Sequence, residues 1–597
     1  MNGTVPAAPA RPAGRRRRRG SRVLPVLLAV VATLAGCASI PESSEPKPAR
    51  DVVRDRSPDP PLQPPRGSDP LTLVRKFVEA NGNPVNEYAA ARQYLVPETA
   101  DQWNPSPVTV IADGFDTVYS GTFETGANAD GSVTVTLRGR RVGRLAPDHT
   151  FVPESGEVEL ELQLRKLDGE WRISEPPGAA ILTYSSFSQN YTQVPIYFLH
   201  PDRESLVPDL RYVQNQPATA QPNVVVDMLL RGPSFALEGA VRTAIPEKAD
   251  IRTNVAEAPD GALVVDLTGV DDQPPQRRQL MAAQIVLSLQ PVTNSRVRLL
   301  SDNVPLLSGQ EAWRPSDFLS YLGEHTLPAD LPGLVVAGGR LYSMEQGKEV
   351  PGPAGRGDYS ILSAALSADG RKLAAVTTGA AGPQLRVGNY GEALQEVSLQ
   401  AERLTRPSWR SSGGSDRNAG EVWTVADGTK VVSVFADGRG GWTTRTVNAA
   451  ELTDRGEITE LRLSRDGVRV AAVVDGQLWV GSVVDDGTDA SVTNVRQLLP
   501  GALQKQVTSV DWRSAALLLV GTSSNTLPVL RVSVDGKDWQ GYPTENLTPP
   551  VTVVAAAPGR PVVVADSRGL WTTPDDTEYW NLHAGRFGPG SVPFYPG

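Results

Sequence analysis

The stretch LSADGRKLAAV, residues 366–376, returns as LSRDGVRVAAV at residues 463–473. Each copy places a Ser-x-Asp-Gly turn between two short runs of small and apolar residues, which is the pattern of a tight β-hairpin. A related unit, PSWRSS, lies between the copies at Trp409, and another, VDWRSA, follows at Trp512. Because these strand–turn–strand units recur every 43 to 54 residues, the sequence predicts an all-β propeller.

The repeat also predicts how the propeller closes. The segment GLVVAGGRLYSM, residues 333–344, has no inner strand of its own, so we expect it to pair with the C-terminal repeat. Such pairing closes the ring and removes exposed sheet edges. We therefore predict about five blades over residues 333–597, with six as the alternative. The inner strands are expected to begin near Ile361, Leu404, Ile458, Val507 and Val551.

Residues 69–192 form a first folded block. They open with the helical pattern DPLTLVRKFVEA, continue with a second helical segment that Pro97 interrupts, and end in alternating strand patterns. Helices followed by strands indicate an α+β domain. The closing stretch KLDGEWRI is similar to the last hairpin of NTF2-like domains, and we expect Trp103 and Trp171 in the core of this block.

Residues 193–310 alternate strands and helices, which predicts an α/β domain. Two strands meet at Pro201-Asp202, a helix ends at Gly232-Pro233, and PPQRRQLMAAQIVLSLQP indicates a second helix. This order, with the motifs YFLHPD, LLRGP, AIPEKADI, VVDLTG and AAQIVLSL, closely resembles the GerMN domain. The resemblance implies a noncatalytic binding module. Residues 311–332 are expected to form a packed connector to the propeller.

The N-terminus predicts a secretory signal rather than a transmembrane helix. Arginines 15–19 precede a mostly apolar run at residues 23–35, which spans about 20 Å and is shorter than the roughly 30 Å hydrocarbon core. The stretch Leu34-Ala35-Gly36-Cys37 resembles the bacterial lipobox. The resemblance implies cleavage between Gly36 and Cys37 and attachment of S-diacylglycerol and N-acyl (palmitate-type) groups to Cys37, with residues 1–36 as the signal peptide.

Charge and composition limit what the mature chain can bind. Residues 1–36 carry seven arginines and no acid, so the mature chain is seven units more negative than −9, near −16. Such a charge argues against nucleic acid as a partner. Residues 37–68 are rich in proline and lack aromatic residues, which indicates an extended linker. We expect a protein anchored by lipid to the outer face of the cytoplasmic membrane.

No catalytic or metal-binding pattern stands out. The sequence contains no P-loop, no G-x-S-x-G and no H-E-x-x-H motif. We expect His200 to be a solvated turn residue. We therefore predict no catalytic residue, no metal site, no cofactor and no enzymatic activity; an enzyme with loops around the propeller channel is the alternative. The remaining histidines, His149, His325 and His583, lack ligand spacing, and the acidic pairs Asp271-Asp272, Asp485-Asp486 and Asp575-Asp576 are expected in solvated loops.

Aromatic residues gather where the first two blocks join. They could stack on a sugar ring, but packing between the domains is the favoured interpretation. The propeller tryptophans are likewise expected mostly in its core. The junction residues are Tyr184, Phe187, Tyr191, Tyr197 and Phe198, and the tryptophans are Trp409, Trp442, Trp479, Trp512, Trp539, Trp571 and Trp580.

The order lipobox, proline-rich linker, α+β domain, GerMN block and propeller resembles the LpqB family of actinobacterial lipoproteins. AARQYL and EWRISEPPGAAIL in the first block carry as much of this resemblance as the GerMN motifs. The family resemblance implies a partner, the extracellular domain of an MtrB-like sensor histidine kinase of the MtrA–MtrB two-component system, and a role in cell-wall and division signalling. The alternative is a peptidoglycan- or glycan-binding envelope module without a signalling role.

We predict that Cys37→Ala leaves an uncleaved or poorly processed precursor, because the thiol that receives the lipid is gone. Metabolic labelling with palmitate followed by gel mobility checks this. Palmitate label on the variant would contradict the lipobox interpretation.

Overall fold

The computed structural model describes residues 63–597 except 121–130, 216, 323–330, 381, 411–419, 486–488, 502, 504, 575–578 and 586. Cys37 and the lipobox residues 34–36 therefore lie outside the described residues. Within the described part, no helix is both long enough and apolar enough to cross a membrane.

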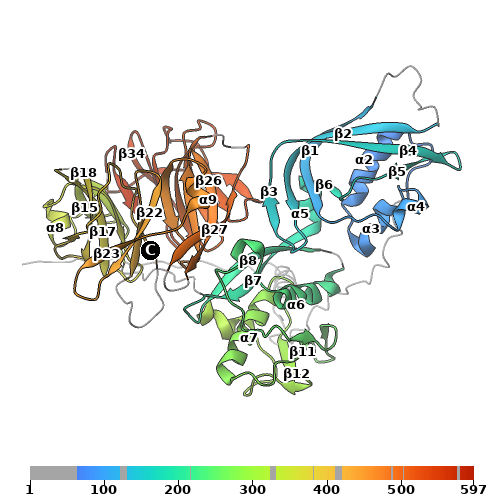
Figure 1. Ribbon diagram of the computed structural model, residues 1–597, viewed down its shortest axis with the longest axis horizontal. Helices are drawn as coiled ribbons and strands as arrows, with labels where there is room; N and C mark the ends of the chain where they lie inside the picture. Colours follow the sequence, from blue (N-terminus) through green and yellow to red (C-terminus); the bar gives the residue numbers. More distant parts are fainter. Residues whose placement is uncertain are drawn as a thin grey trace, which may run out of the picture. The chain divides into compact units, whose positions relative to one another are not determined.

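The N-terminal domain packs its helices on a six-stranded sheet of order β5-β4-β2-β1-β6, with β3 on β2. Asp69 caps α2 by accepting the N–H groups of Leu71 and Thr72, and the buried α2 residues Leu73 and Phe77 face the sheet. Figure 1 shows α2 lying against the long strands β1 and β2. The elements are α2 (Pro70–Asn81), α3 (Val85–Arg92), α4 (Pro97–Ala100), β1 (Val108–Tyr119), β2 (Val133–Leu145), β3 (Phe151–Pro153), β4 (Glu157–Leu167), β5 (Glu170–Glu175), β6 (Ile181–Thr183) and α5 (Tyr184–Asn190).

The predicted α+β order of this domain is confirmed. The second helical segment is split, because α3 ends at Arg92 and the short α4 begins at Pro97, whose missing N–H is tolerated at a first helical position. Trp103 is buried as expected, whereas Trp171 is only half-buried.

The middle domain contains a hairpin, β7–β8, and a β11–α7–β12 unit whose two strands are parallel, which confirms the α/β prediction. Helix α7 is buried on every side from Met281 to Leu289, and its polar residues Gln284 and Ser288 bond to the backbone of Tyr197 in β7. These bonds give the buried N–H and carbonyl groups of Tyr197 hydrogen-bond partners on the edge of β7 that faces the helix. The elements are β7 (Tyr191–Leu199), β8 (Leu206–Gln214), η1 (Ala218–Ala220), α6 (Gln221–Arg231), η2 (Phe235–Leu237), β9 (Asp250–Ile251), β10 (Ala256–Glu257), β11 (Leu263–Thr268), α7 (Pro275–Leu289), β12 (Val297–Ser301), β13 (Val304–Pro305) and η3 (Pro315–Tyr321).

The described C-terminal strands form six sheets, five of them four-stranded. The sixth consists of β14 and β15 from the start of the region and β36 from its end, so the predicted ring closure is confirmed and the six-blade alternative holds. Strand β36 contacts β32 and β16, the first strands of the two flanking sheets. Figure 1 draws this region from yellow to red.

The first three propeller sheets are built from β14 (Leu334–Ala337), β15 (Arg340–Ser343), β16 (Ile361–Leu366), β17 (Lys372–Gly379), β18 (Gly382–Asn389), β19 (Gln395–Glu396), β20 (Ser408–Arg410), β21 (Glu421–Ala426), β22 (Lys430–Ala436) and β23 (Trp442–Thr446), with α8 (Pro353–Arg356). The remaining elements are α9 (Ala450–Thr453), β24 (Ile458–Leu463), β25 (Arg469–Val474), β26 (Gln477–Asp485), β27 (Ala490–Gln497), β28 (Val507–Ser514), β29 (Leu517–Thr522), β30 (Val529–Ser533), β31 (Trp539–Gly541), β32 (Val553–Ala555), β33 (Val562–Asp566), β34 (Gly569–Thr573), β35 (Asn581–Leu582) and β36 (Val592–Phe594).

The Ser-x-Asp-Gly turn works through its side chains. In the first copy, the Ser367 hydroxyl donates to Asp369 at 2.6 Å and accepts the Lys372 N–H at 2.9 Å. Gly370 has a φ of +72°, a conformation that L side chains rarely adopt. Residues 464–467 repeat these bonds. A third copy, residues 533–536, joins β30 to β31, outside the strand–turn–strand units that the sequence predicts.

Candidate functional site: the propeller interior and its two ends

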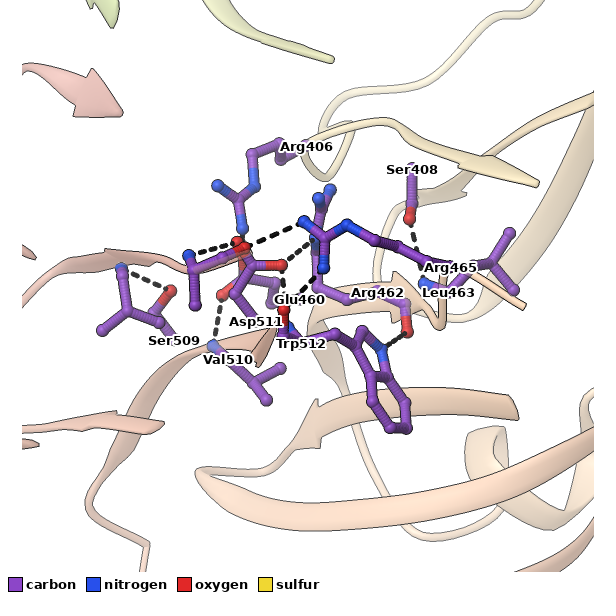
Figure 2. Close-up of polar contacts among 12 residues, drawn as sticks. Arg406, Ser408, Glu460, Arg462, Leu463, Arg465, Ser509, Val510, Asp511 and Trp512 are labelled. Atoms are coloured by element: carbon purple, nitrogen blue, oxygen red, sulfur yellow. Dashed lines mark hydrogen bonds and ion pairs between the residues drawn. The ribbon is translucent and has the colours of Figure 1, made fainter. Parts of the chain in front are cut away.

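Charged side chains from three neighbouring sheets form a buried network inside the propeller (Figure 2). Arg406 Nη2 donates to Glu460 Oε1 at 2.8 Å, and Arg462 Nε lies 3.5 Å from Asp511 Oδ1. Burial, with Arg406 as a second cause, lowers the pKa of Arg462 to about 10. The guanidinium therefore remains protonated at neutral pH, and its charge is balanced by the neighbouring carboxylates.

The carboxylates of this network are occupied by structural hydrogen bonds. Glu460 accepts from Arg406 at one oxygen and from the Val510 N–H at the other, while Asp511 accepts the backbone N–H groups of Trp512 and Ala556. A general base needs a free oxygen within reach of the substrate proton. This geometry indicates a structural role for the carboxylates of Glu460 and Asp511 rather than a catalytic one.

The same pattern joins successive inner strands. In each case a side chain on one inner strand accepts a backbone N–H from the next sheet, so the four sheets that begin with β20, β24, β28 and β32 are tied to one another. The pairs are Ser408 with Leu463 at 2.9 Å, Glu460 with Val510 at 3.0 Å, Ser509 with Val554 at 3.2 Å and Asp511 with Ala556 at 3.0 Å.

Two arginines hold the segment around β36. Arg406 Nη1 donates to the Pro593 carbonyl at 3.3 Å, and Arg465 Nη2 donates to the Ala556 carbonyl at 2.9 Å and to the Pro596 carbonyl at 3.5 Å. The closure of the ring therefore depends on buried cations as well as on strand pairing.

The middle domain contacts the propeller at one of its ends. Beyond the end of β24, the Asp466 carbonyl accepts from Arg203 Nη2 at 2.6 Å, and Arg469 Nη2 donates to the Pro208 carbonyl. A small cavity of about 100 Å³ lies here between Tyr197 and Trp512. This end is therefore a contact between domains.

The other end of β24 borders an open groove of about 450 Å³, the propeller-face groove, which touches three sheets. Leu362 at the groove is 51% exposed, and the ion pair Arg403–Glu457, at 2.5 Å, lies beside it. The surface of the groove is mostly apolar, although threonines and charged residues also line it; its apolar side chains are those of Leu362, Pro383, Leu404, Val425 and Ile458. An exposed, mostly apolar concavity of this kind is suited to holding a side chain of another molecule.

His200 is buried, so the prediction of a solvated turn is wrong. Its Nδ1 accepts the Asp202 N–H at 3.0 Å, and its Nε2 lies 3.2 Å from Arg203 Nη2, the atom that contacts the propeller. Loss of hydration, with Arg203 and Arg410 nearby, lowers the pKa of the imidazole to about 3. The turn motif gave no sign that a second domain covers it.

All three domains meet at Asp535, in the third Ser-x-Asp-Gly turn. Its Oδ2 accepts from Tyr212 Oη of the middle domain at 2.7 Å. The neighbouring Lys537 places its ammonium 5.3 Å from the ring centroid of Tyr184 and 5.9 Å from that of Phe187 in the N-terminal domain. Because this buried carboxylate accepts hydrogen bonds from the middle domain and from the propeller, it helps to fix the position of one domain against the other.

The predicted packing between domains holds for part of the aromatic run, since Phe187 contacts Tyr212 of the middle domain and Tyr184 contacts the propeller, whereas Phe198 lies within one domain. Phe187 stacks on Tyr191 with ring centroids 4.8 Å apart, and Tyr184 Oη donates to Asp538. Phe198 is fully buried in the middle-domain core, against which Tyr197 packs. Most propeller tryptophans are also core residues, but Trp539 is 44% exposed.

The other histidines are separate from one another. His149 Nδ1 lies 3.2 Å from the Tyr212 carbonyl, and His583 Nδ1 accepts the Gly585 N–H at 3.1 Å. Burial lowers the pKa of both imidazoles. His325 lies outside the described residues. Among the residues that are described, no three His, Cys, Asp or Glu side chains are grouped so as to hold a metal ion.

The acidic pairs differ from one another. Asp272 is exposed and bonds Lys248 at 2.8 Å, as expected for a solvated loop. Asp485 is not solvated: its side chain is 17% exposed and lies 2.5 Å from Arg410 Nη1. A long-range arginine partner, invisible in the local sequence, explains the difference. Asp486, Asp575 and Asp576 lie outside the described residues.

Comparison with known proteins gives full-length matches. Curated proteins described as lipoprotein LpqB are 33% identical in Rhodococcus jostii (95% of this chain, 96% of that protein) and 30% identical in Mycobacterium tuberculosis (95% and 98%). This chain belongs to the LpqB lipoprotein family. Family models match the LpqB N-terminal domain at residues 63–188, a sporulation and spore germination domain at 195–307, and the LpqB β-propeller domain at 339–596.

Among solved structures, this LpqB-family chain is similar to the tandem GerMN domains of the sporulation protein GerM from Bacillus subtilis. The match has 18% identity, a TM-score of 0.18, and covers 21% of this chain and 46% of that chain. The score is too low to carry an argument.

We predict that Glu460→Ala destabilises the propeller by about 3–5 kcal/mol, because it leaves the buried Arg406 cation without its partner. The matched control is Glu457→Ala, three residues earlier, which removes the exposed pair with Arg403 and is expected to change stability little. Urea unfolding followed by tryptophan fluorescence checks both. Equal effects of the two substitutions would contradict the role given to the buried pair.

We predict that the unfolding free energy falls as the pH drops below 6.5. The pKa of His200 is about 3 in the folded protein, against 6.5 in the unfolded chain. Between pH 6.5 and pH 3 only the unfolded chain binds a proton at this residue, so the unfolding free energy falls by about 1.4 kcal/mol per pH unit. His200→Asn keeps an acceptor for the Asp202 N–H but does not titrate, so its stability should depend less on pH. Urea unfolding at pH 7, 6 and 5 measures the difference, and parallel pH profiles would refute it.

Proposed function

We propose that this lipoprotein is an extracytoplasmic, lipid-anchored accessory protein that binds and modulates an MtrB-like sensor histidine kinase in cell-wall and division signalling. It acts from the outer face of the cytoplasmic membrane. Membership of the LpqB family supports an envelope lipoprotein, and the propeller-face groove is the observation that carries the binding role.

The groove is suited to protein recognition for two reasons. It lies at the end of the propeller opposite the middle domain, since β24 runs from Ile458 at the groove to the residues before Asp466 at the domain contact. It also presents an exposed apolar residue, Leu362, beside the charged pair Arg403–Glu457. Interfaces commonly combine a small apolar centre with such a polar rim.

Modulation requires more than contact. A kinase sensor domain that exchanges between two conformations is shifted only by a partner that binds one of them more tightly. Coupling free energies of this type are about 1–3 kcal/mol. The hydrogen bonds between the domains suit such a role. Because Arg203 and Arg469 hold the propeller against the middle domain, the groove has a fixed orientation relative to that domain.

We predict that Leu362→Asp reduces association with the kinase at least tenfold, because a carboxylate replaces the exposed apolar contact. Leu582→Asp is the matched control, since Leu582 is similarly exposed, at 54%, but lies on the outer strand β35. Photo-crosslinking probes at Leu362 and at Leu582 in cells, followed by mass spectrometry, identify the partner directly.

The outcomes separate the alternatives. A kinase ectodomain as the dominant adduct of the Leu362 probe supports the proposal. No adduct from either probe, together with normal kinase output in a deletion strain, would rule out the accessory role.

The second candidate function is a peptidoglycan- or glycan-binding envelope module, which a polar cleft in the N-terminal domain favours.

A further inference from the structure

A second concavity, the α3–α4 cleft, lies between helix α3, the segment 102–105 that follows α4, and the end of β8. Its volume is about 510 Å³, within the range of about 300–1,000 Å³ that ligand pockets occupy. The cleft is separate in sequence from the propeller-face groove, and none of its residues takes part in the propeller network.

Two aromatic rings form its base, and both are held in place. Tyr88 and Trp103 meet edge to face with centroids 6.1 Å apart. The Tyr88 hydroxyl bonds the Tyr191 hydroxyl at 2.9 Å, and Trp103 Nε1 donates to the Pro177 carbonyl at 2.7 Å. Since the polar ends of both rings are engaged in the protein, the part that faces the cleft is hydrocarbon and fixed.

Carboxamides surround this base. Asn86 and Gln102 are exposed, and neither side chain bonds any described residue. Asn104 Oδ1 accepts the Ser106 N–H at 3.0 Å, which leaves its amino group to face outward. Gln214 from β8 completes the wall. A carboxamide carries both donors and an acceptor, and those of Asn86 and Gln102 are exposed at the cleft.

The charges at the cleft nearly cancel. Arg92 lies with its guanidinium 5.7 Å from the Trp103 ring centroid, and its Nε donates to the Glu87 carbonyl at 2.8 Å. Glu87, also at the cleft, carries the opposite charge. The site therefore lacks the positive excess that a nucleotide or phosphate needs, and its rim is too polar for a lipid chain.

We propose that the α3–α4 cleft binds an uncharged sugar chain, with hydroxyl or acetamido groups bonded to Asn86, Gln102 and Asn104 above a floor closed by the buried rings of Tyr88 and Trp103. Hydroxyl and acetamido groups, like carboxamides, both donate and accept hydrogen bonds, so this wall complements them. The inference gives the glycan-binding candidate a site and does not depend on the kinase interaction.

The test is calorimetric titration of the full mature chain with tetra-N-acetylchitotetraose. We expect binding by the wild-type chain and about three- to tenfold weaker binding by Gln102→Ala and by Asn86→Gly, the effect of losing one neutral hydrogen bond. Both side chains are exposed, and glycine tolerates the φ of +51° at residue 86, so both variants should fold normally. Gln346→Ala, an exposed glutamine of the propeller, is the matched control and should bind like the wild type.

Each other outcome overturns the proposal. It fails if the wild-type chain does not bind the oligosaccharide, if both cleft variants bind it with unchanged affinity, or if the cleft binds a proline-rich peptide and no sugar. Leu362→Asp should retain full sugar binding, so failure of the kinase interaction and failure of the cleft are distinguished.

Discussion

The arrangement of the folded domains depends on one buried carboxylate, Asp535. It accepts hydrogen bonds from Tyr212 of the middle domain and from Ser533 and the Lys537 N–H of its own turn, while Lys537 lies over aromatic rings of the N-terminal domain. A carboxylate removed from water needs several donors, and here they come from separate domains. The Ser-x-Asp-Gly turn that defines the propeller repeat therefore also joins the propeller to the rest of the protein.

The sequence was sufficient for features that depend on local patterns. Helix α2 begins after Asp69, α6 ends before Gly232, and the segment before residue 344 closes the ring, all as the periodicity and the turn residues indicated. Where the prediction failed, a distant partner decided the outcome. The turn around His200 is polar in sequence but is covered by the propeller, and Asp485 sits in a loop-like context but pairs with Arg410.

Neither candidate binding site could be read from the sequence. The propeller-face groove draws its lining from three sheets, and the α3–α4 cleft combines residues near Asn86 with Gln214 across the domain boundary. No periodicity marks such combinations, because the residues share only a surface. The polar network of Arg406, Glu460 and Asp511 is equally non-local, and it explains why conspicuous charges inside the propeller serve its architecture.

The pairing of β14 with β36 has a consequence for folding kinetics. Each four-stranded sheet forms from consecutive hairpins, which are local and fast, whereas Leu334 must find Phe594 across the whole propeller. Loop closure over such a distance carries an entropic cost, so this step belongs late in folding. Until it occurs, one edge of β14 has no partner strand and can pair with other chains. The hydrogen bonds of Arg406 and Arg465 to the β36 segment help to keep this edge of β14 paired in the folded protein.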